Sequence, residues 1–242
     1  MNIRNFIIGV STSVLIAGSV NAETYNFDLK NDNYLRFYTG INDIQDVDVS
    51  QDATIFGFTN ITADYAWGFD AGWTVGAQYG YPLFDPSIPF FGNLRGEADF
   101  SYSKAYAEDI DGTVTLTYGN GSTVTASGSL KVNGKVEVLD IYNNFLWFDQ
   151  KAGSNAIRPY AGFGLGFSHI EHSIEDIAGE VLGQVEKGTA IGYQLIVGAD
   201  FYTFNNGLTG GARIVGRRVN NFSTGVDASE SLGGQLTLRY DF

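Results

Sequence analysis

The sequence predicts an all-β fold, an eight-stranded antiparallel up-and-down transmembrane β-barrel, and three observations lead to it. The last residues alternate between an apolar and a polar face and end on an aromatic residue, Phe242. No stretch after the first 22 residues has the ~18 consecutive apolar residues of a membrane-spanning helix, although 44% of the chain is hydrophobic. The chain also has no cysteine, so an exported form must be held together without disulfides.

The closing segment, 231–242, shows the alternation most directly. Its apolar positions are Leu232, Leu236, Leu238, Tyr240 and Phe242, and its polar positions are Ser231, Gln235, Thr237, Arg239 and Asp241. A strand with one apolar and one polar face is typical of a barrel with lipid outside and water or polar side chains inside. A closed barrel also pairs every strand edge within the membrane.

Residues 1–22 are predicted to be a cleaved signal peptide. A basic start ending at Arg4 is followed by an uncharged apolar run and by small residues before a cleavage site after Ala22. The alternative, an N-terminal membrane anchor, is disfavoured because the run is shorter than the ~20 residues that a spanning helix needs. We therefore expect one barrel domain, 23–242, exported to the cell outer membrane.

The net charge of −13 argues against two functions, nucleic-acid binding and docking on an anionic lipid surface as a peripheral protein. Both depend on an excess of Lys and Arg, which this chain lacks. We expect the excess acid to lie mostly in solvated loops.

Eight segments have the alternation expected of strands, each about long enough for a tilted span. They are 34–41, 72–81, 94–103, 139–147, 160–168, 191–202, 208–217 and 231–242. Turn signals separate them, including prolines in 85–89 and Asn205-Asn206-Gly207. Four long external loops, about 43–70, 108–134, 171–187 and 218–229, alternate with three short turns, as in bacterial outer-membrane barrels.

Two of these loops have strand-like sequence of their own. The part 54–67 is strand-prone, and 108–134 has two Thr/Val-rich runs around turn residues at 119–122, which predicts a hairpin above the rim. Ten strands are the alternative if both cross the bilayer. On 160–168 every second residue on one face is Gly or Ser apart from Tyr160, which suggests room for a large side chain from across the lumen.

Charged residues fall on the inward parity of the predicted strands. They are Arg36, Arg95, Glu97, Asp99, Asp140, Asp200, Arg213, Arg217, Arg239 and Asp241. An eight-stranded barrel is just wide enough to be filled by side chains, and confined charges must pair. The sequence therefore favours a salt-bridged plug over a polar gate for small solutes.

Aromatic residues on the outward parity lie near strand ends, where interfacial girdles occur. The predicted girdle is Trp73, Tyr81, Tyr102, Trp147, Phe167 and Phe201, together with Tyr240 and Phe242.

Catalysis and metal binding have little support. The two histidines, His169 and His172, have Ser and Glu neighbours, but residues three apart on a strand point to opposite faces. The acidic segment 109–112 lacks the full twelve-residue calcium loop. We predict no enzyme activity, no cofactor and no metal.

Four stretches carry a resemblance to a known group of proteins. They are DAGWTVGA at 70–77, NLRGEA at 93–98, RPYAGFGLG at 158–166 and LRYDF at 238–242. The chain resembles the small outer-membrane β-barrel proteins of the OmpA membrane-domain, opacity-protein and surface-antigen type, with porin-like members. The resemblance implies the fold, a Gram-negative outer membrane, and a terminal assembly signal, Tyr240 and Phe242, recognised by the barrel-assembly machinery.

The expected function is structural and surface-facing: support of membrane integrity, and adhesion or surface contact through the external loops. The alternatives are a narrow pore for small solutes and, third, a lipid-modifying or other outer-membrane enzyme. The expected partners are outer-membrane lipid, lipopolysaccharide, the barrel-assembly machinery, and host or surface ligands at the loops. Nucleic acid is not expected.

Overall fold

The computed structural model describes residues 33–45, 47–53, 58–84, 94–148, 157–177, 180–203, 208–220 and 228–242. All regular structure in these ranges is β, which confirms the predicted all-β class. Within the same ranges there is no helix with the length and apolar character needed to cross a membrane. The predicted signal peptide, 1–22, and the predicted turns at 85–89 and 205–207 lie outside the described residues.

The described residues form ten strands. In chain order they are β1 (Tyr34–Ile44), β2 (Val47–Ala53), β3 (Phe58–Phe69), β4 (Gly72–Pro82), β5 (Leu94–Tyr118), β6 (Thr123–Phe148), β7 (Arg158–Ile177), β8 (Glu180–Thr203), β9 (Leu208–Val219) and β10 (Ser229–Asp241).

Eight of these strands pair in a closed antiparallel ring. Its order is β1, β4, β5, β6, β7, β8, β9, β10 and back to β1. The closing ladder joins the first and last strands from Tyr34↔Asp241 to Ile44↔Ser231. Because each of the eight has a neighbour on both sides, the ring leaves no open sheet edge at the level where all eight are present.

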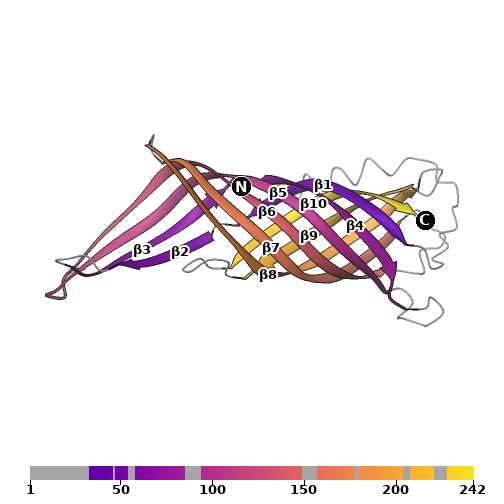
Figure 1. Cartoon of the computed structure of the whole chain (residues 1–242), viewed down its shortest axis with the longest axis horizontal. Helices are drawn as coiled ribbons and strands as arrows, with labels where there is room; N and C mark the ends of the chain where they lie inside the picture. The colour runs from indigo at the N-terminus through magenta and orange to yellow at the C-terminus, as the bar shows by residue number, and fades with distance from the viewer. Residues whose placement is uncertain are drawn as a thin grey trace.

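The other two strands, β2 and β3, lie outside the ring. β3 pairs with the outer half of β5, from Phe58↔Tyr118 to Phe69↔Ala107, and β2 pairs with β3. Together with residues 104–138 of β5 and β6 and 170–190 of β7 and β8, they form a sheet that we call the extension. In Figure 1 the extension is the end of the molecule that carries β2 and β3, opposite the end that carries the C-terminus.

The extension corrects three of the predicted loops. The range 43–70 contains β2 and β3, 108–134 is mostly the outer halves of β5 and β6, and 171–187 is mostly the outer ends of β7 and β8. The Thr, Ser and Asp content of these ranges suggested loops, yet their period-2 alternation continues as paired strand. In the fourth range, 218–229, β9 ends at Val219 and β10 begins at Ser229, and 221–227 lie outside the described residues.

The hairpin expected within 108–134 is present. β5 and β6 pair from Leu94↔Trp147 to Thr117↔Thr123, and their turn is closed by Gly121 at φ 81°, a left-handed conformation that favours glycine. A register shift between Ala107 and Asp109 inserts an extra residue into β5. Such a bulge moves the inward-facing positions from odd to even numbers, so apolar residues beyond it still face inward.

Candidate functional site: the barrel interior

The ring encloses a polar interior behind an apolar exterior. On β1 the inward side chains of Tyr34, Arg36 and Tyr38 are at most 5% exposed, whereas Phe37 and Ile41 on the other face are at least 50% exposed. The same alternation runs through the other ring strands, which brings charged residues from distant parts of the chain into one space.

Three arginines meet one carboxylate at the end of the ring that carries the C-terminus. Asp200 of β8 accepts from Arg36 at 3.4 Å, from Arg158 at 3.4 Å and from Arg239 at 3.3 Å. Arg36 also donates from Nη1 to Glu97 Oε1 at 2.8 Å, and Arg239 pairs with Asp241. The excess of positive charge around Asp200 is therefore shared among three carboxylates.

Aromatic rings separate these guanidinium groups. Arg239 lies 3.9 Å from the centroid of Tyr34, Arg36 lies 4.8 Å from Tyr160, and Arg158 lies 4.9 Å from Phe148. Guanidinium groups are favourably placed over aromatic faces, the more so when both are removed from water. The rings therefore fill space and stabilise the arginines at once.

Asp99 and Arg213 occupy the middle of the interior. Tyr38 and Gln78 each donate to Asp99 at 2.8 Å, and Arg213 donates from Nη1 to Gln78 Oε1 at 2.8 Å. The guanidinium of Arg213 also lies 4.2 Å from the ring of Tyr38. Arg213 thus reaches from β9 to β4, two strands that are not neighbours in the ring.

Asp140 and Arg217 form the layer nearest the extension. Arg217 of β9 is paired with Asp140 of β6, and its Nη2 donates to Gln194 Oε1 at 3.0 Å. Ser168 and Ser101 donate to the two oxygens of the same carboxylate at 2.6 and 3.1 Å. Each described layer thus contains at least one ion pair or hydrogen bond that crosses the lumen.

An apolar cluster closes the interior above this layer. It consists of inward residues at the base of the extension, namely Ile44, Ala105, Val136, Val138, Ile170, Ala190 and Val219, with Phe69 packed against it. We call it the collar. The prediction of a polar lumen did not include it, although the alternation of Val136 and Val138 with charged neighbours was the available signal.

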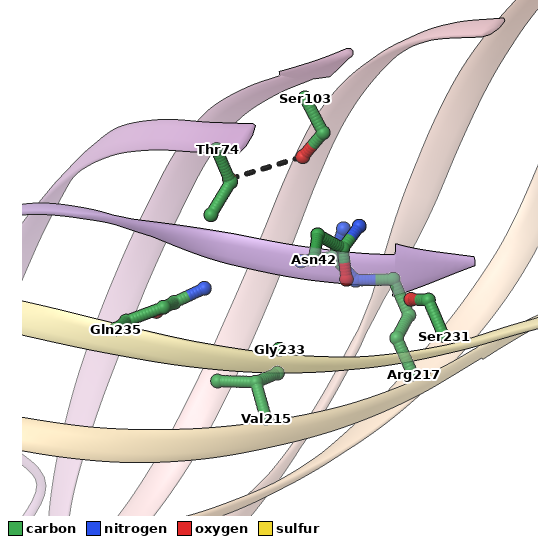
Figure 2. A pocket seen from close by; sticks show the side chains of 8 residues that line it. All are labelled: Asn42, Thr74, Ser103, Val215, Arg217, Ser231, Gly233 and Gln235. Atoms are coloured by element: carbon green, nitrogen blue, oxygen red, sulfur yellow. Dashed lines mark hydrogen bonds between the residues drawn. The ribbon is translucent and has the colours of Figure 1, made fainter. Parts of the chain in front are cut away.

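A small polar pocket lies between the charge network and the collar. Figure 2 shows it on the β1, β4 and β10 side of the lumen, beside the hydrogen bond from Ser103 to Thr74 at 3.0 Å. Its lining residues are Asn42, Thr74, Ser103, Val215, Arg217, Ser231, Gly233 and Gln235. Hydroxyl, amide and guanidinium groups of this kind suit water or a very small polar solute.

The glycines of β7 have a different use from the one predicted. A Cβ on Gly162 would lie 2.5 Å from Leu146, and Cβ atoms on Gly164 and Gly166 would meet Asn144 and Tyr142. All three partners belong to the neighbouring strand β6, and not to the opposite wall. The absence of a Cβ at these glycines therefore leaves room for side chains of β6 that lie against β7 along the inner wall of the ring.

The structure brings the predicted interior charges together, with two differences of detail. Arg217 and Asp241 are partly buried near the two ends of the lumen, while Arg36, Arg95, Glu97, Asp99, Asp140, Asp200, Arg213 and Arg239 are buried. Arg158 also points inward and is absent from the predicted set, because the predicted strand begins only at Tyr160. Its separation of two residues from Tyr160, on the same face of β7, was the signal that could have identified it.

The predicted girdle residues lie at two levels. Register places Trp73, Tyr102 and Phe167 toward the extension, and Tyr81, Trp147 and Phe201 toward the other end. Trp73 and Tyr102 are in ring contact at 5.4 Å. Tyr240 and Phe242, the predicted assembly signal, stack at 6.2 Å and are exposed on the outside of the ring.

The two histidines point to opposite faces of β7. His169 is exposed and hydrogen-bonded to Thr189 at 2.8 Å. His172 lies inside the extension, 5.7 Å from the ring of Trp67 and 5.9 Å from that of Phe69. Removal from water lowers the pKa of His172 to about 4. In the described ranges no three His, Cys, Asp or Glu groups are placed to hold a metal ion.

Comparison with known proteins gives structural matches only. No protein-family model matches the chain, and no curated protein is significantly similar to it. The crystal structure of Neisserial surface protein A superposes with a TM-score of 0.50 at 15% identity, covering 87% of this chain and 97% of that one. The outer membrane protein OprG from Pseudomonas aeruginosa gives 0.42 at 14% identity, covering 88% and 96%.

The likeness to Neisserial surface protein A is one of fold. It agrees with the ring of paired strands and with the exposed apolar exterior, which is the pattern of a membrane-spanning barrel. The chain therefore has the fold of a small outer-membrane β-barrel.

Proposed function

We propose that the protein is a non-enzymatic, closed outer-membrane barrel that holds a rigid sheet out from the cell surface for contact with other molecules. The observation that carries this proposal is the set of buried ion pairs across the lumen, such as Arg36 to Glu97 and Arg217 to Asp140. A lumen filled in this way supports the barrel wall and leaves the extension as the accessible part.

The extension has the properties of a presenting surface. It continues the strands of the ring without a break, so it is held by ladder hydrogen bonds along β5, β6, β7 and β8. Its outward face is rich in hydroxyl and carboxylate groups, with cross-strand pairs such as Thr113 with Ser127 and Thr115 with Thr125. Long connections on rigid barrels commonly carry recognition.

A narrow pore for small solutes is the second candidate. The polar pocket beside Arg217 favours it, because a small solute or water there needs only the Arg217–Asp140 pair to separate before it meets the lumen below. A catalytic role is not proposed, since His169 and His172 face opposite sides of β7.

Single-channel conductance of residues 23–242, refolded in a planar bilayer, distinguishes the two candidates. We expect a folded barrel, verified by the gel shift between unheated and boiled samples, to remain electrically silent. Discrete steps that change when Arg217 is replaced by Gln would contradict the closed barrel and support the pore.

Shortening the extension tests the presenting role. In one variant, residues 108–133 are replaced by a two-residue Asn-Gly turn, so that the register pair Ala107 and Gly134 flanks the new hairpin turn. We expect the barrel to fold and cell-surface adhesion to be lost. A Thr115→Val variant keeps the hairpin length and serves as the matched control. Unchanged adhesion of the shortened variant would contradict the proposal.

A further inference from the structure

The outer part of β6 has an open edge. On one side β6 pairs with β5 from Thr123 to Trp147, but on the other side it pairs with β7 only from Val132 inward. Among the described residues, no strand lies beside 123–131 on that second side. Alternate residues of this edge present N–H and C=O groups without a ladder partner, and such an edge is a template for a further strand.

This edge is also uncovered on both of its faces. Every residue from Thr123 to Ser129 is exposed, whereas the inward residues of β6 from Val132 onward are buried. In Figure 1 the hairpin of β5 and β6 forms the tip of the molecule farthest from the C-terminus. A second molecule that approaches the extension from outside the cell therefore meets this edge first.

The sequence of the edge lacks the usual protection against pairing. Residues 112–130 contain no charged residue and no proline, in a chain with a net charge of −13. The Thr and Val residues at 123–125 favour strand structure. Charged side chains and proline are the common devices that prevent association at an edge, and 123–131 has only Lys131, at its inner end.

Two other open edges of the extension are better protected. β2 pairs only with β3, and its sequence, VDVSQDA, would place Asp48 opposite Asp52 if two copies paired about Ser50. β8 has an open side at 180–190, because β9 meets it only from Gly192, and this stretch contains three charged residues. Like charges directly opposite one another destabilise a strand pair. Pairing with a second copy is therefore least opposed at β6.

We propose that the outer edge of β6 pairs with the same edge of a second copy, in antiparallel orientation, and that this pairing joins two facing membranes. The inference rests on the proposed function, in which the extension points away from the cell. β6 runs from the tip toward its own membrane, so the β6 strands of two facing membranes run in opposite directions. Copies side by side in one membrane would align β6 in parallel, with Lys131 beside Lys131 when in register.

An antiparallel pair centred on Ser127 uses the whole edge. Residues 123–131 then pair with themselves, Thr125 lies opposite Ser129, and Lys131 lies opposite Thr123, so no two charges meet. Cross-strand pairs of Thr with Thr or Ser are favourable. Opposite residues also belong to the same face of the two hairpins, so the joined sheet keeps its hydroxyl-rich face on one side.

The acidic surroundings determine how salt acts on this pairing. The net charge of −13 makes two approaching copies repel each other, and at physiological ionic strength salt screens this repulsion over about 8 Å. The pairing itself depends on backbone hydrogen bonds along an uncharged edge. We therefore expect association to strengthen as salt is raised, the opposite of an association driven by unlike charges.

Vesicle clustering tests the proposal with the protein in a membrane. Residues 23–242 are refolded into vesicles that carry a green or a red dye, folding is verified by the gel shift, and clustering is followed by energy transfer between the dyes. We expect clustering when both populations contain the protein and none when one population is protein-free. Clustering that needs the protein in only one population would contradict pairing between copies.

A charge at the centre of the edge is the sharpest change. Ser127→Lys places two lysines opposite each other and should slow clustering about 5-fold. Thr113→Lys adds the same charge and removes the same Thr113–Ser127 hydrogen bond, but it lies on β5, one strand from the edge, and should cluster like the wild type. Mixing Ser127→Lys vesicles with Ser127→Glu vesicles should restore clustering, because opposite charges then meet.

Three results would overturn the proposal. They are an equal loss in both lysine variants, no recovery in the mixture of Ser127→Lys and Ser127→Glu, and no protein-dependent clustering at any salt concentration. Adhesion to a surface that lacks this protein does not need a second copy. The proposed function is therefore tested separately by the shortened hairpin, and a failure here is distinct from a failure there.

Discussion

The ring and the extension share the strands β5 to β8, but the polar and apolar faces of these strands differ between the two regions. On β5 the ring part points Glu97 and Asp99 inward and Phe100 outward. Beyond the bulge, Val114 and Leu116 share the face of Trp67, with Val114 43% exposed, while Thr113 and Thr115 lie on the opposite face. A single continuous strand is thus polar inside and apolar outside in the ring, whereas at the base of the extension its inward residues are apolar, and farther out its hydroxyls lie on the face opposite Trp67.

This inversion shows that the surroundings of a strand set its pattern. In lipid an unpaired polar group costs several kcal/mol, so the ring hides its polar groups in the lumen, where they satisfy one another. In water the same alternation has the lowest free energy when the hydroxyl groups face the solvent and the apolar groups pack together inside. The boundary lies where Ser103 is still polar and Ala105 belongs to the collar.

Removing the carboxylate of Asp200 should give the largest difference between the two regions. An Asp200→Ala change leaves Arg36, Arg158 and Arg239 without their shared partner inside the ring. We expect a loss of about 3 to 5 kcal/mol in the free energy of unfolding, the usual result of breaking a buried pair. Urea unfolding in lipid vesicles, followed by tryptophan fluorescence, measures it.

The matched change in the extension is Asp52→Ala. Asp52 is exposed and accepts from Thr62 at 2.7 Å, so we expect less than about 0.5 kcal/mol. Similar losses for the two variants would show that the interior network does not hold the ring together.

Two glycine replacements give a smaller contrast. A Cβ on Gly80 would run into the ring of Tyr34, whereas a Cβ on Gly128 of the extension would meet nothing within 4 Å. We expect Gly80→Val to cost about 1 to 3 kcal/mol through overpacking, and Gly128→Val to be neutral or slightly stabilising in a strand. The urea midpoints of the two variants compare them directly, and a neutral Gly80→Val would argue against tight packing along the wall.

The smallest expected effect depends on pH and is confined to the extension. Burial between Trp67 and Phe69 lowers the pKa of His172 from 6.5 to about 4, so the unfolded state binds more protons than the folded state between these values. Its register partners are Val136 on β6 and Glu186 on β8. The stabilisation is complete above pH 6.5 and is lost as the pH falls toward 4.

Limited proteolysis at a series of pH values measures this effect. We expect cleavage in the extension to increase below pH 6.5 while the ring stays protected. A His172→Phe variant should lose the dependence, because it keeps an aromatic side chain without a titrating group. Cleavage that rises equally in both proteins would assign the pH dependence to other groups.

The ring could be predicted from the sequence because lipid imposes a simple rule. Its strands have uncharged outward faces, such as Phe163, Leu165 and Phe167, and this pattern also predicts which charges point inward. Pairing partners are less predictable: no spacing in the sequence indicates that Arg36, Arg158 and Arg239 share Asp200, since these contacts depend on ring geometry.

The extension was harder to predict because its strands follow the rule for water. Thr113 to Thr117 has strand-like alternation, but its polar residues are also those of loops. The sequence also did not show which side chains occupy the space beside the β7 glycines. A glycine pattern indicates that there is space, but it does not indicate which strand supplies the side chain that occupies it. Arg158 was missed for a similar reason, since a strand start and a turn end look alike next to Pro159.

The ladder between β1 and β10 has a consequence for the timing of folding. Tyr34 pairs with Asp241, so the ring cannot close until β10 has been synthesised and has reached β1. Contacts of such long sequence separation form slowly. Until they form, one edge of β1 and one edge of β10 stay open to incorrect partners. Ring closure must therefore follow export of every strand from β1 to β10, and a protein that shields these edges in the meantime would raise the yield.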